Sequence, residues 1–163
     1  MRSSQRGFGL GLGGGLFDTI VVPLIVIGVL VWIAIPAYRD YRTLARVNEG
    51  IGLAAPAKAA VEKAFAAKGP ADMSQRATTG WTVPAPAEHL QSVAIAGDGK
   101  ITLRFNESVA PQGENEIQIV PVSGGKALDL SSAASAGRKF EWQCGGPAGR
   151  TTVLEKYRPK DCR

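Results

Sequence analysis

The sequence has few of the side chains that enzymes and metal centres require. Its 163 residues include one histidine, His89, and two cysteines, Cys144 and Cys162. Two cysteines alone cannot complete a tetrahedral zinc site, and His89 is distant from them in the sequence. No nucleophile stands beside a general base, and no two carboxylates have a spacing suited to catalysis. The sequence therefore predicts a protein that is not an enzyme and that uses no metal ion or cofactor.

The two cysteines lie close together near the C-terminus. Because they cannot form a zinc site by themselves, a disulfide between Cys144 and Cys162 is the better interpretation. A disulfide indicates an oxidising compartment outside the cytoplasm.

Charge is absent from the 18 residues 20–37, IVVPLIVIGVLVWIAIPA. A helix rises ~1.5 Å per residue, so this run covers most of a ~30 Å hydrocarbon core. It is longer than the apolar region of a signal peptide, and no small-residue cleavage site follows it. A soluble chain would also have little to cover a helix that is apolar on every side. We therefore predict a membrane-inserted helix.

An amphipathic segment follows the apolar run without a turn signal. Apolar residues recur there at steps of three and four, which mark one face of a helix: Leu44, Val47, Ile51, Ala54, Val61 and Phe65. We expect a helix from about Leu16 to Lys68, ended by Gly69-Pro70. Three residues should bend or loosen it: Gly28, Pro36 and Pro56.

The remaining residues predict a loop and then strands. Residues 69–89 are rich in glycine and proline, which indicates a loop, and Trp81 should pin this loop to the core. Strands are expected at 92–96, 100–105, 116–122 and 139–144, with an extension of the pairing at 127–130. Short links without helices favour an antiparallel sheet with one face against the helix. The expected fold class is α+β, a long N-terminal helix packed on a four-stranded antiparallel sheet.

Positive charge is concentrated at the C-terminal end. The net charge is +5, and residues 137–163 hold seven Lys or Arg against three acids. A basic patch can attract nucleic acid or another anionic surface, whereas the plainer interpretation is a solvated face. The candidates for a DNA-binding or anion-binding role are Arg150, Lys156, Arg158, Lys160 and Arg163.

Four parts of the sequence resemble the type IV pilins, and more particularly the type IVa subgroup. They are QRGF at 5–8, IAIPAYRDY at 33–41, AKAAVE at 57–62, and WQC at 142–144 together with YRPKDCR at 157–163. Taken in this order, they are similar to four features of a type IV pilin: the leader junction, the exit of the membrane helix, the part of the helix that packs on the sheet, and the two edges of the disulfide loop. The resemblance spans nearly the whole chain.

The resemblance implies three regions. Residues 1–7 would be a leader removed by prepilin peptidase between Gly7 and Phe8, with Phe8 then N-methylated. Residues 8–42 would form the glycine-rich start and transmembrane half of the helix, and residues 43–163 the globular head with its disulfide loop 144–162. The subunit would span the bacterial inner membrane once, with its head outside the cytoplasm, and then enter an extracellular pilus.

The front of the chain departs from the family pattern. Pilins place Thr-Leu-x-Glu directly after the Phe, whereas Gly9–Leu16 stands here, and Leu12 takes the place of the glutamate. Asp18 is the sole acid before Asp40, so it is the candidate for the assembly role of that glutamate. Helix capping is the alternative role for Asp18. Cleavage after Gly7 is the favoured site, and cleavage after Gly14 or Gly15 is the alternative.

The resemblance implies a structural subunit of a type IV pilus that serves adhesion, twitching motility or DNA uptake. Its partners would be copies of itself, the inner membrane, prepilin peptidase and the pilus assembly machinery, with DNA or a host surface as further candidates. Two alternatives stay open: a minor or DNA-binding pilin that uses the basic C-terminal loop, and a secretion-system pseudopilin.

Overall fold

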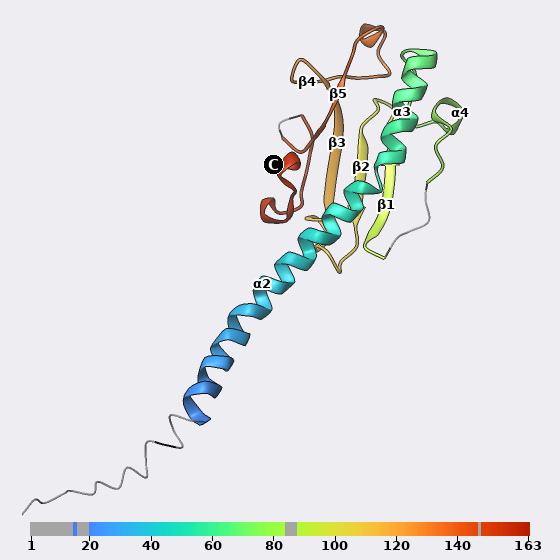
Figure 1. The fold of residues 1–163 in the computed structure, drawn as a ribbon. Helices are drawn as coiled ribbons and strands as arrows, with labels where there is room; N and C mark the ends of the chain where they lie inside the picture. The colour runs from blue at the N-terminus through green and yellow to red at the C-terminus, as the bar shows by residue number, and fades with distance from the viewer. Residues whose placement is uncertain (1–14, 16–19, 84–87, 147) are drawn as a thin grey trace, which may run out of the picture. The chain divides into compact units, whose positions relative to one another are not determined.

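The structure is a computed structural model that describes residues 15, 20–83, 88–146 and 148–163. The chain divides into two units, Met1–Arg39 and Asp40–Arg163. Helix α2 (Val22–Gly52) begins in the first unit and ends in the second, where all the strands lie (Figure 1).

The long helix is present and has one interruption. Helix α2 is followed by a turn at Leu53 and Ala54, after which α3 (Ala55–Lys68) begins. Pro56 lies in the first turn of α3, where it has no N–H to donate to the carbonyl of Gly52. The loosening predicted at Pro56 is therefore confirmed.

The C-terminal end of α3 lies where Gly69-Pro70 predicted it. Gly69 adopts a φ of +72° and donates its N–H to the carbonyl of Phe65 at 2.9 Å. A positive φ costs glycine little because it has no Cβ, so the chain can leave the helix here.

The described residues form a five-stranded antiparallel sheet rather than the expected four-stranded one. Its strands are β1 (Leu90–Ile95), β2 (Ile101–Phe105), β3 (Glu116–Ser123), β4 (Lys126–Ala127) and β5 (Glu141–Cys144). The path is β1-β2-β3-β4, and β5 also pairs with β3 (Figure 1). The extra strand β4 arises because Gly124 and Gly125 both take positive φ and turn the chain back onto β3 for two residues.

The loop predicted at residues 69–89 contains a short helix that the sequence did not indicate. Helix α4 (Arg76–Thr79) is four residues long and ends at Gly80, whose φ is +66°. The ammonium of Lys68 donates to the carbonyls of Ala77 and Thr78 at 2.7 and 3.1 Å. Trp81 packs against the core, as expected.

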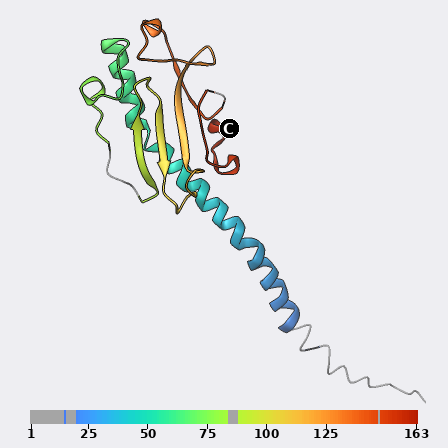
Figure 2. The same ribbon diagram turned by 180° about the vertical axis from the view of Figure 1, so that it is seen from behind.

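The core lies between one face of the sheet and the helices. Alternate residues of β2 and of the start of β3 are buried, since side chains of a strand point to opposite faces in turn, whereas residues 119–122 of β3 are all buried. The fully buried members include Ile101, Leu103, Phe105, Ile117 and Ile119, which meet Val47 and Ala57 of the helices. Figure 2 shows the sheet from the side that α3 does not cover.

Candidate functional site

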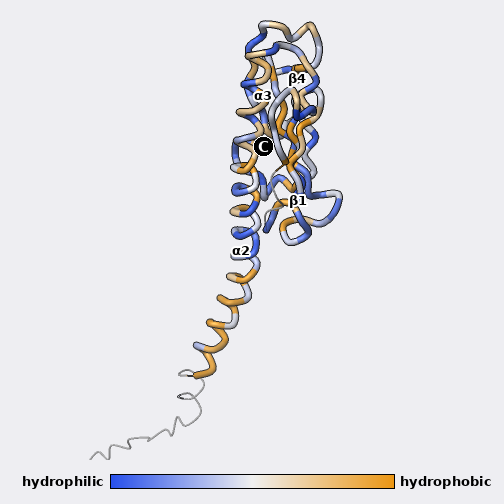
Figure 3. Tube along the Cα trace, turned by 90° about the vertical axis from the view of Figure 1, so that its right-hand side faces the viewer, coloured by the Kyte–Doolittle hydropathy of each residue, from blue (hydrophilic) through white to orange (hydrophobic). Residues whose placement is uncertain are grey.

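The N-terminal half of α2 is apolar and exposed. Among its side chains, Leu24 is 62% exposed, Trp32 is 78% exposed and Ile33 is 57% exposed. Figure 3 shows this part of the helix as hydrophobic, whereas hydrophilic residues enter α2 further along. The helix is long and apolar enough to cross a membrane, with a mean hydropathy of 2.0 and no buried residue in its most apolar 18-residue window.

Several predicted N-terminal site residues cannot be placed. Gly7, Phe8 and Asp18 lie outside the residues that the structure describes. Leader cleavage, N-methylation and the assembly role of Asp18 therefore stay predictions.

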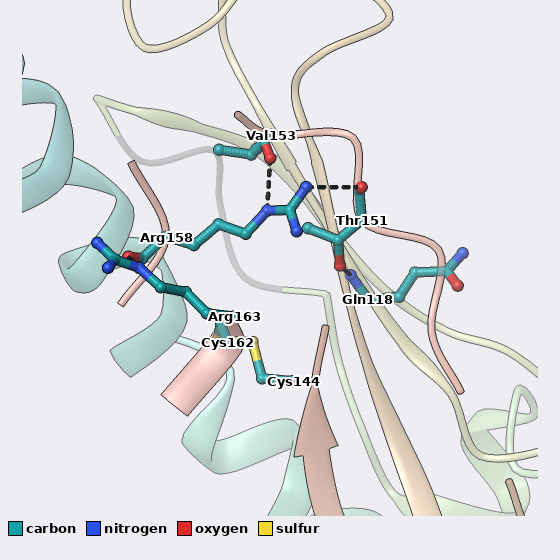
Figure 4. The surroundings of a disulfide bond; sticks show 7 residues. All are labelled: Gln118, Cys144, Thr151, Val153, Arg158, Cys162 and Arg163. Atoms are coloured by element: carbon teal, nitrogen blue, oxygen red, sulfur yellow. Dashed lines mark hydrogen bonds between the residues drawn. A yellow bond between two sulfur atoms is a disulfide. The ribbon is translucent and has the colours of Figure 1, made fainter. Parts of the chain in front are cut away.

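The second feature is the C-terminal loop, defined here as residues 144–162. A disulfide joins Cys144 at the end of β5 to Cys162, with a Cα–Cα distance of 4.4 Å, so the predicted bond is confirmed (Figure 4). Gly145 has a φ of +72°, and a Cβ there would overlap the carbonyl of Cys162. The backbones of the two loop ends are thus in direct contact.

Hydroxyl groups hold the C-terminal loop against the edge of β3. The N–H of Glu116 donates to Oγ1 of Thr152 at 3.0 Å, and the N–H of Thr152 donates to the carbonyl of Glu116 at 2.8 Å. The N–H of Gln118 donates to Oγ1 of Thr151 at 3.5 Å. The loop therefore satisfies edge groups of β3 that β5 does not reach, since β5 pairs only with residues 119–122.

The five basic residues differ in what they contact. The guanidinium of Arg158 donates to the carbonyls of Val153 and Thr151 at 2.6 and 3.1 Å, so this half-buried side chain braces the loop from inside (Figure 4). The guanidinium of Arg163 donates to the carbonyl of Arg158 at 3.3 Å.

Lys156, the third basic residue with a partner, is paired with Asp40 of α2. Its ammonium lies 3.2 Å from Oδ1 of Asp40, and the hydroxyl of Tyr157 donates to the same oxygen at 2.7 Å. These contacts lower the pKa of Asp40, chiefly through the Tyr157 hydrogen bond and then through Lys156. Sequence reasoning missed this cluster because 116 residues separate Asp40 from Lys156.

Arg150 and Lys160 are the remaining two candidates, and both are exposed. Within the described part of the chain, the guanidinium of Arg150 and the ammonium of Lys160 have no hydrogen-bond or ion-pair partner. These two are therefore the members of the basic set whose charged groups have no partner among the described residues, and both are open to an external anion.

A second contact that sequence reasoning missed joins α3 to β5. The indole N–H of Trp142 donates to the carboxylate of Glu62 at 2.6 Å. Trp142 also makes an edge-to-face contact with Phe140, which in turn packs on Phe65 at a ring-centroid distance of 5.6 Å. The strand that ends at Cys144 is thereby anchored to the helix.

No group of three or more His, Cys, Asp or Glu side chains that could hold a metal ion occurs among the described residues.

Comparison with protein families gives a match over most of the chain. The family model described as pilin (bacterial filament) matches residues 43–163. That range includes the second half of the helix, the sheet and the C-terminal loop.

Curated relatives span the full chain. Fimbrial protein EcpC of Eikenella corrodens is 29% identical over 168 residues, which cover 100% of this chain and 94% of the relative. Type IV major pilin protein PilE1 of Neisseria gonorrhoeae is 28% identical over 182 residues, which cover 100% of this chain and 89% of the relative.

Among solved structures, the crystal structure of the type IV pilin of Pseudomonas aeruginosa strain Pa110594 has the same fold. It is 24% identical, has a TM-score of 0.59, and the match covers 74% of this chain and 97% of that one.

Proposed function

Because the chain belongs to the pilin family of bacterial filament proteins, we propose that it is held in the inner membrane before it polymerises. As a member of that family it is a structural subunit of a type IV pilus and assembles with copies of itself. A structural role, rather than a catalytic one, is the function that its residues support.

The exposed apolar half of α2 carries this proposal. So many exposed apolar side chains are costly in water, but they are compatible with lipid and with the interior of a helix bundle. Moving such a helix from lipid into a filament exchanges one apolar environment for another. Packing between helices therefore decides whether the free energy favours the filament. A heterologous contact that does not close on itself then gives an open fibre.

Processing and export precede assembly in the proposed sequence of events. Prepilin peptidase would cut between Gly7 and Phe8, Phe8 would be N-methylated, and the assembly machinery would extract the subunit from the membrane. The head, with its disulfide, would lie outside the cytoplasm, where a disulfide persists.

Electron microscopy of sheared surface material, combined with mass spectrometry of its N-terminus, tests this proposal. We expect filaments that contain this chain and a mature N-terminus at methylated Phe8. Filaments should be absent from a strain whose chain lacks residues 1–42, although the head is still produced. Filaments built from that truncated chain would contradict the role given to the helix.

DNA binding by the C-terminal loop is the second candidate function, and the exposed cations of Arg150 and Lys160 favour it. Phosphate contacts release counterions, so affinity should fall steeply with salt. Reversing both charges, with Arg150→Glu and Lys160→Glu, should abolish binding in a gel-shift assay. Lys63→Glu with Lys126→Glu, at exposed positions on α3 and β4, changes the net charge by the same amount and is the matched control. Equal binding by the two variants would exclude the loop.

The second candidate function has another form: a minor pilin that uses the same basic C-terminal loop. A secretion-system pseudopilin is less well supported, because the resemblance associates the C-terminal disulfide loop with pilins rather than with major pseudopilins.

A further inference from the structure

A polar cavity opens on the head. Its volume is about 370 Å³, within the ~300–1,000 Å³ range of small-molecule sites. It is lined by Gln91, Arg104, Gln112, Gly113, Asn115 and Glu116. These residues come from β1, β2, β3 and the segment between β2 and β3, which lie side by side in Figures 1 and 2.

The backbone around the cavity is held in a defined shape. The register of β1 against β2 shifts between Leu90 and Ser92, so Gln91 is the extra residue of a bulge. Bulges redirect side chains and are frequent beside functional sites. In the segment between β2 and β3, the N–H of Glu114 donates to the carbonyl of Pro111 at 3.0 Å and closes a turn. Gly113 lies within this turn and has a φ of +90°.

Three of the lining residues are held by contacts within the protein. The amide of Asn115, which is only 5% exposed, donates to the carbonyl of Phe105 at 2.7 Å. Arg104 and Glu116 are paired across β2 and β3, with two guanidinium nitrogens on one carboxylate oxygen. Their charges cancel, so the lining is polar but carries no net charge.

Several polar side-chain groups of this cavity have no hydrogen-bond partner among the described residues. The side-chain amides of Gln91 and Gln112 have no hydrogen-bond partner among the residues that the structure describes. Within the same residues, the amide oxygen of Asn115 and the second carboxylate oxygen of Glu116 accept no hydrogen bond. The unused groups include both donors and acceptors, because each amide supplies an NH₂ and a carbonyl.

This combination defines a class of ligand. An anion would meet Glu116 as well as Arg104, and an apolar molecule would bury unpaired amides at a cost. A neutral ring with several hydroxyl groups matches both the donors and the acceptors, since each hydroxyl can donate one hydrogen bond and accept others. We propose that this cavity binds a neutral hexose unit of a glycan.

The test is saturation-transfer NMR on the full chain in detergent micelles, with glucose, galactose, N-acetylglucosamine and lactose as probes. At least one of these sugars should receive saturation, and the double variant Gln91→Ala, Gln112→Ala should bind it at least about tenfold more weakly, which corresponds to about 1.4 kcal/mol. Both glutamines are exposed, so the double variant should keep the circular dichroism spectrum and melting curve of the parent.

The control variant is Asn48→Ala, which removes an exposed amide of α2 outside the cavity and should bind the sugar as the parent does. Two results would overturn the proposal: no transfer to any of the four neutral sugars at millimolar concentration, or equal binding by the double variant. Neither of them would affect the filament proposal, because the cavity does not use the apolar helix.

Discussion

The hydroxyl of Tyr157 donates a hydrogen bond of 2.7 Å to the carboxylate of Asp40, although 117 residues separate them. Tyr157 lies inside the C-terminal loop, and Asp40 is the first residue of the second unit, beyond the uncharged run that ends at residue 37. Lys156 joins the same carboxylate, and its ammonium lies 4.5 Å from the centre of the Tyr157 ring. The loop is therefore tied to α2 as well as to β3 and β5.

This tie should depend on pH. The pKa of Asp40 is lowered in the folded protein, so its stabilisation is present above the ordinary value of about 3.9 and is lost as the pH falls through the lower folded value. Replacing Asp40 with Asn should lower the thermal midpoint slightly at pH 7. The difference from the parent chain should shrink as the pH falls below the ordinary value and vanish below the lowered pKa of folded Asp40, where both side chains are neutral. A difference of equal size at both pH values, measured by circular dichroism, would exclude an electrostatic origin.

Gly50 should be intolerant of a side chain. It is buried in α2, and a Cβ at this position would overlap the ring of Phe105. Gly50→Ala should therefore destabilise the head by about 1–3 kcal/mol, as overpacking does in other cores. Gly52→Ala is the matched control, because no atom lies within 4 Å of its Cβ position. That change should be neutral or should stabilise by up to about 1 kcal/mol. Urea unfolding curves that ranked the two variants in the opposite order would refute the packing argument.

Removal of the disulfide should loosen the C-terminal loop and lower the stability of the head. The bond spans a sequence separation of 18 residues, and a loop near this size contributes about 3 kcal/mol in the chain-entropy model. A variant with Cys144→Ser and Cys162→Ser should show this loss in urea unfolding. Non-reducing mass spectrometry of the parent chain should recover the crosslinked peptide, and two free thiols in exported protein would contradict the bond.

Deletion of residues 1–42 should leave a soluble, folded, monomeric head. The exposed apolar side chains are removed, whereas Val47, Val61 and Phe65 remain to pack on the sheet. Deletion of residues 1–39 should give a slightly more stable head, because it retains Asp40 and the contact with Tyr157. Aggregation without cooperative unfolding, detected by light scattering and urea titration, would show that the helix is divided at the wrong place.

Asp18→Asn should separate the two roles considered for this acid. Pairing with the terminal amine of a neighbouring subunit needs the negative charge, whereas a helix cap needs only an acceptor oxygen. If pairing is the role, the variant should be processed and held in the membrane but form no filaments under the electron microscope. Normal filaments would leave Asp18 as a cap.

The sequence by itself determined the features that depend on local patterns. The uncharged run at residues 20–37 specifies an exposed apolar helix, since no other part of so short a chain could cover it. Gly69-Pro70 sets the end of α3, and alternation of side chains sets the inner face of β2 and of the first half of β3. The two cysteines indicated a disulfide with each other because the sequence places no further metal-ligating side chains near them to complete a zinc site.

Tertiary structure alone decided which distant groups meet. The contacts of Asp40 with Tyr157 and of Glu62 with Trp142 join residues 117 and 80 positions apart, and no local pattern encodes such distances. The same holds for Arg158, which a count of charges assigned to an external anion and which the folded loop turns toward its own carbonyls. Charge and hydropathy are properties of the residue, whereas its partner depends on how strands and loops bring the chain back on itself.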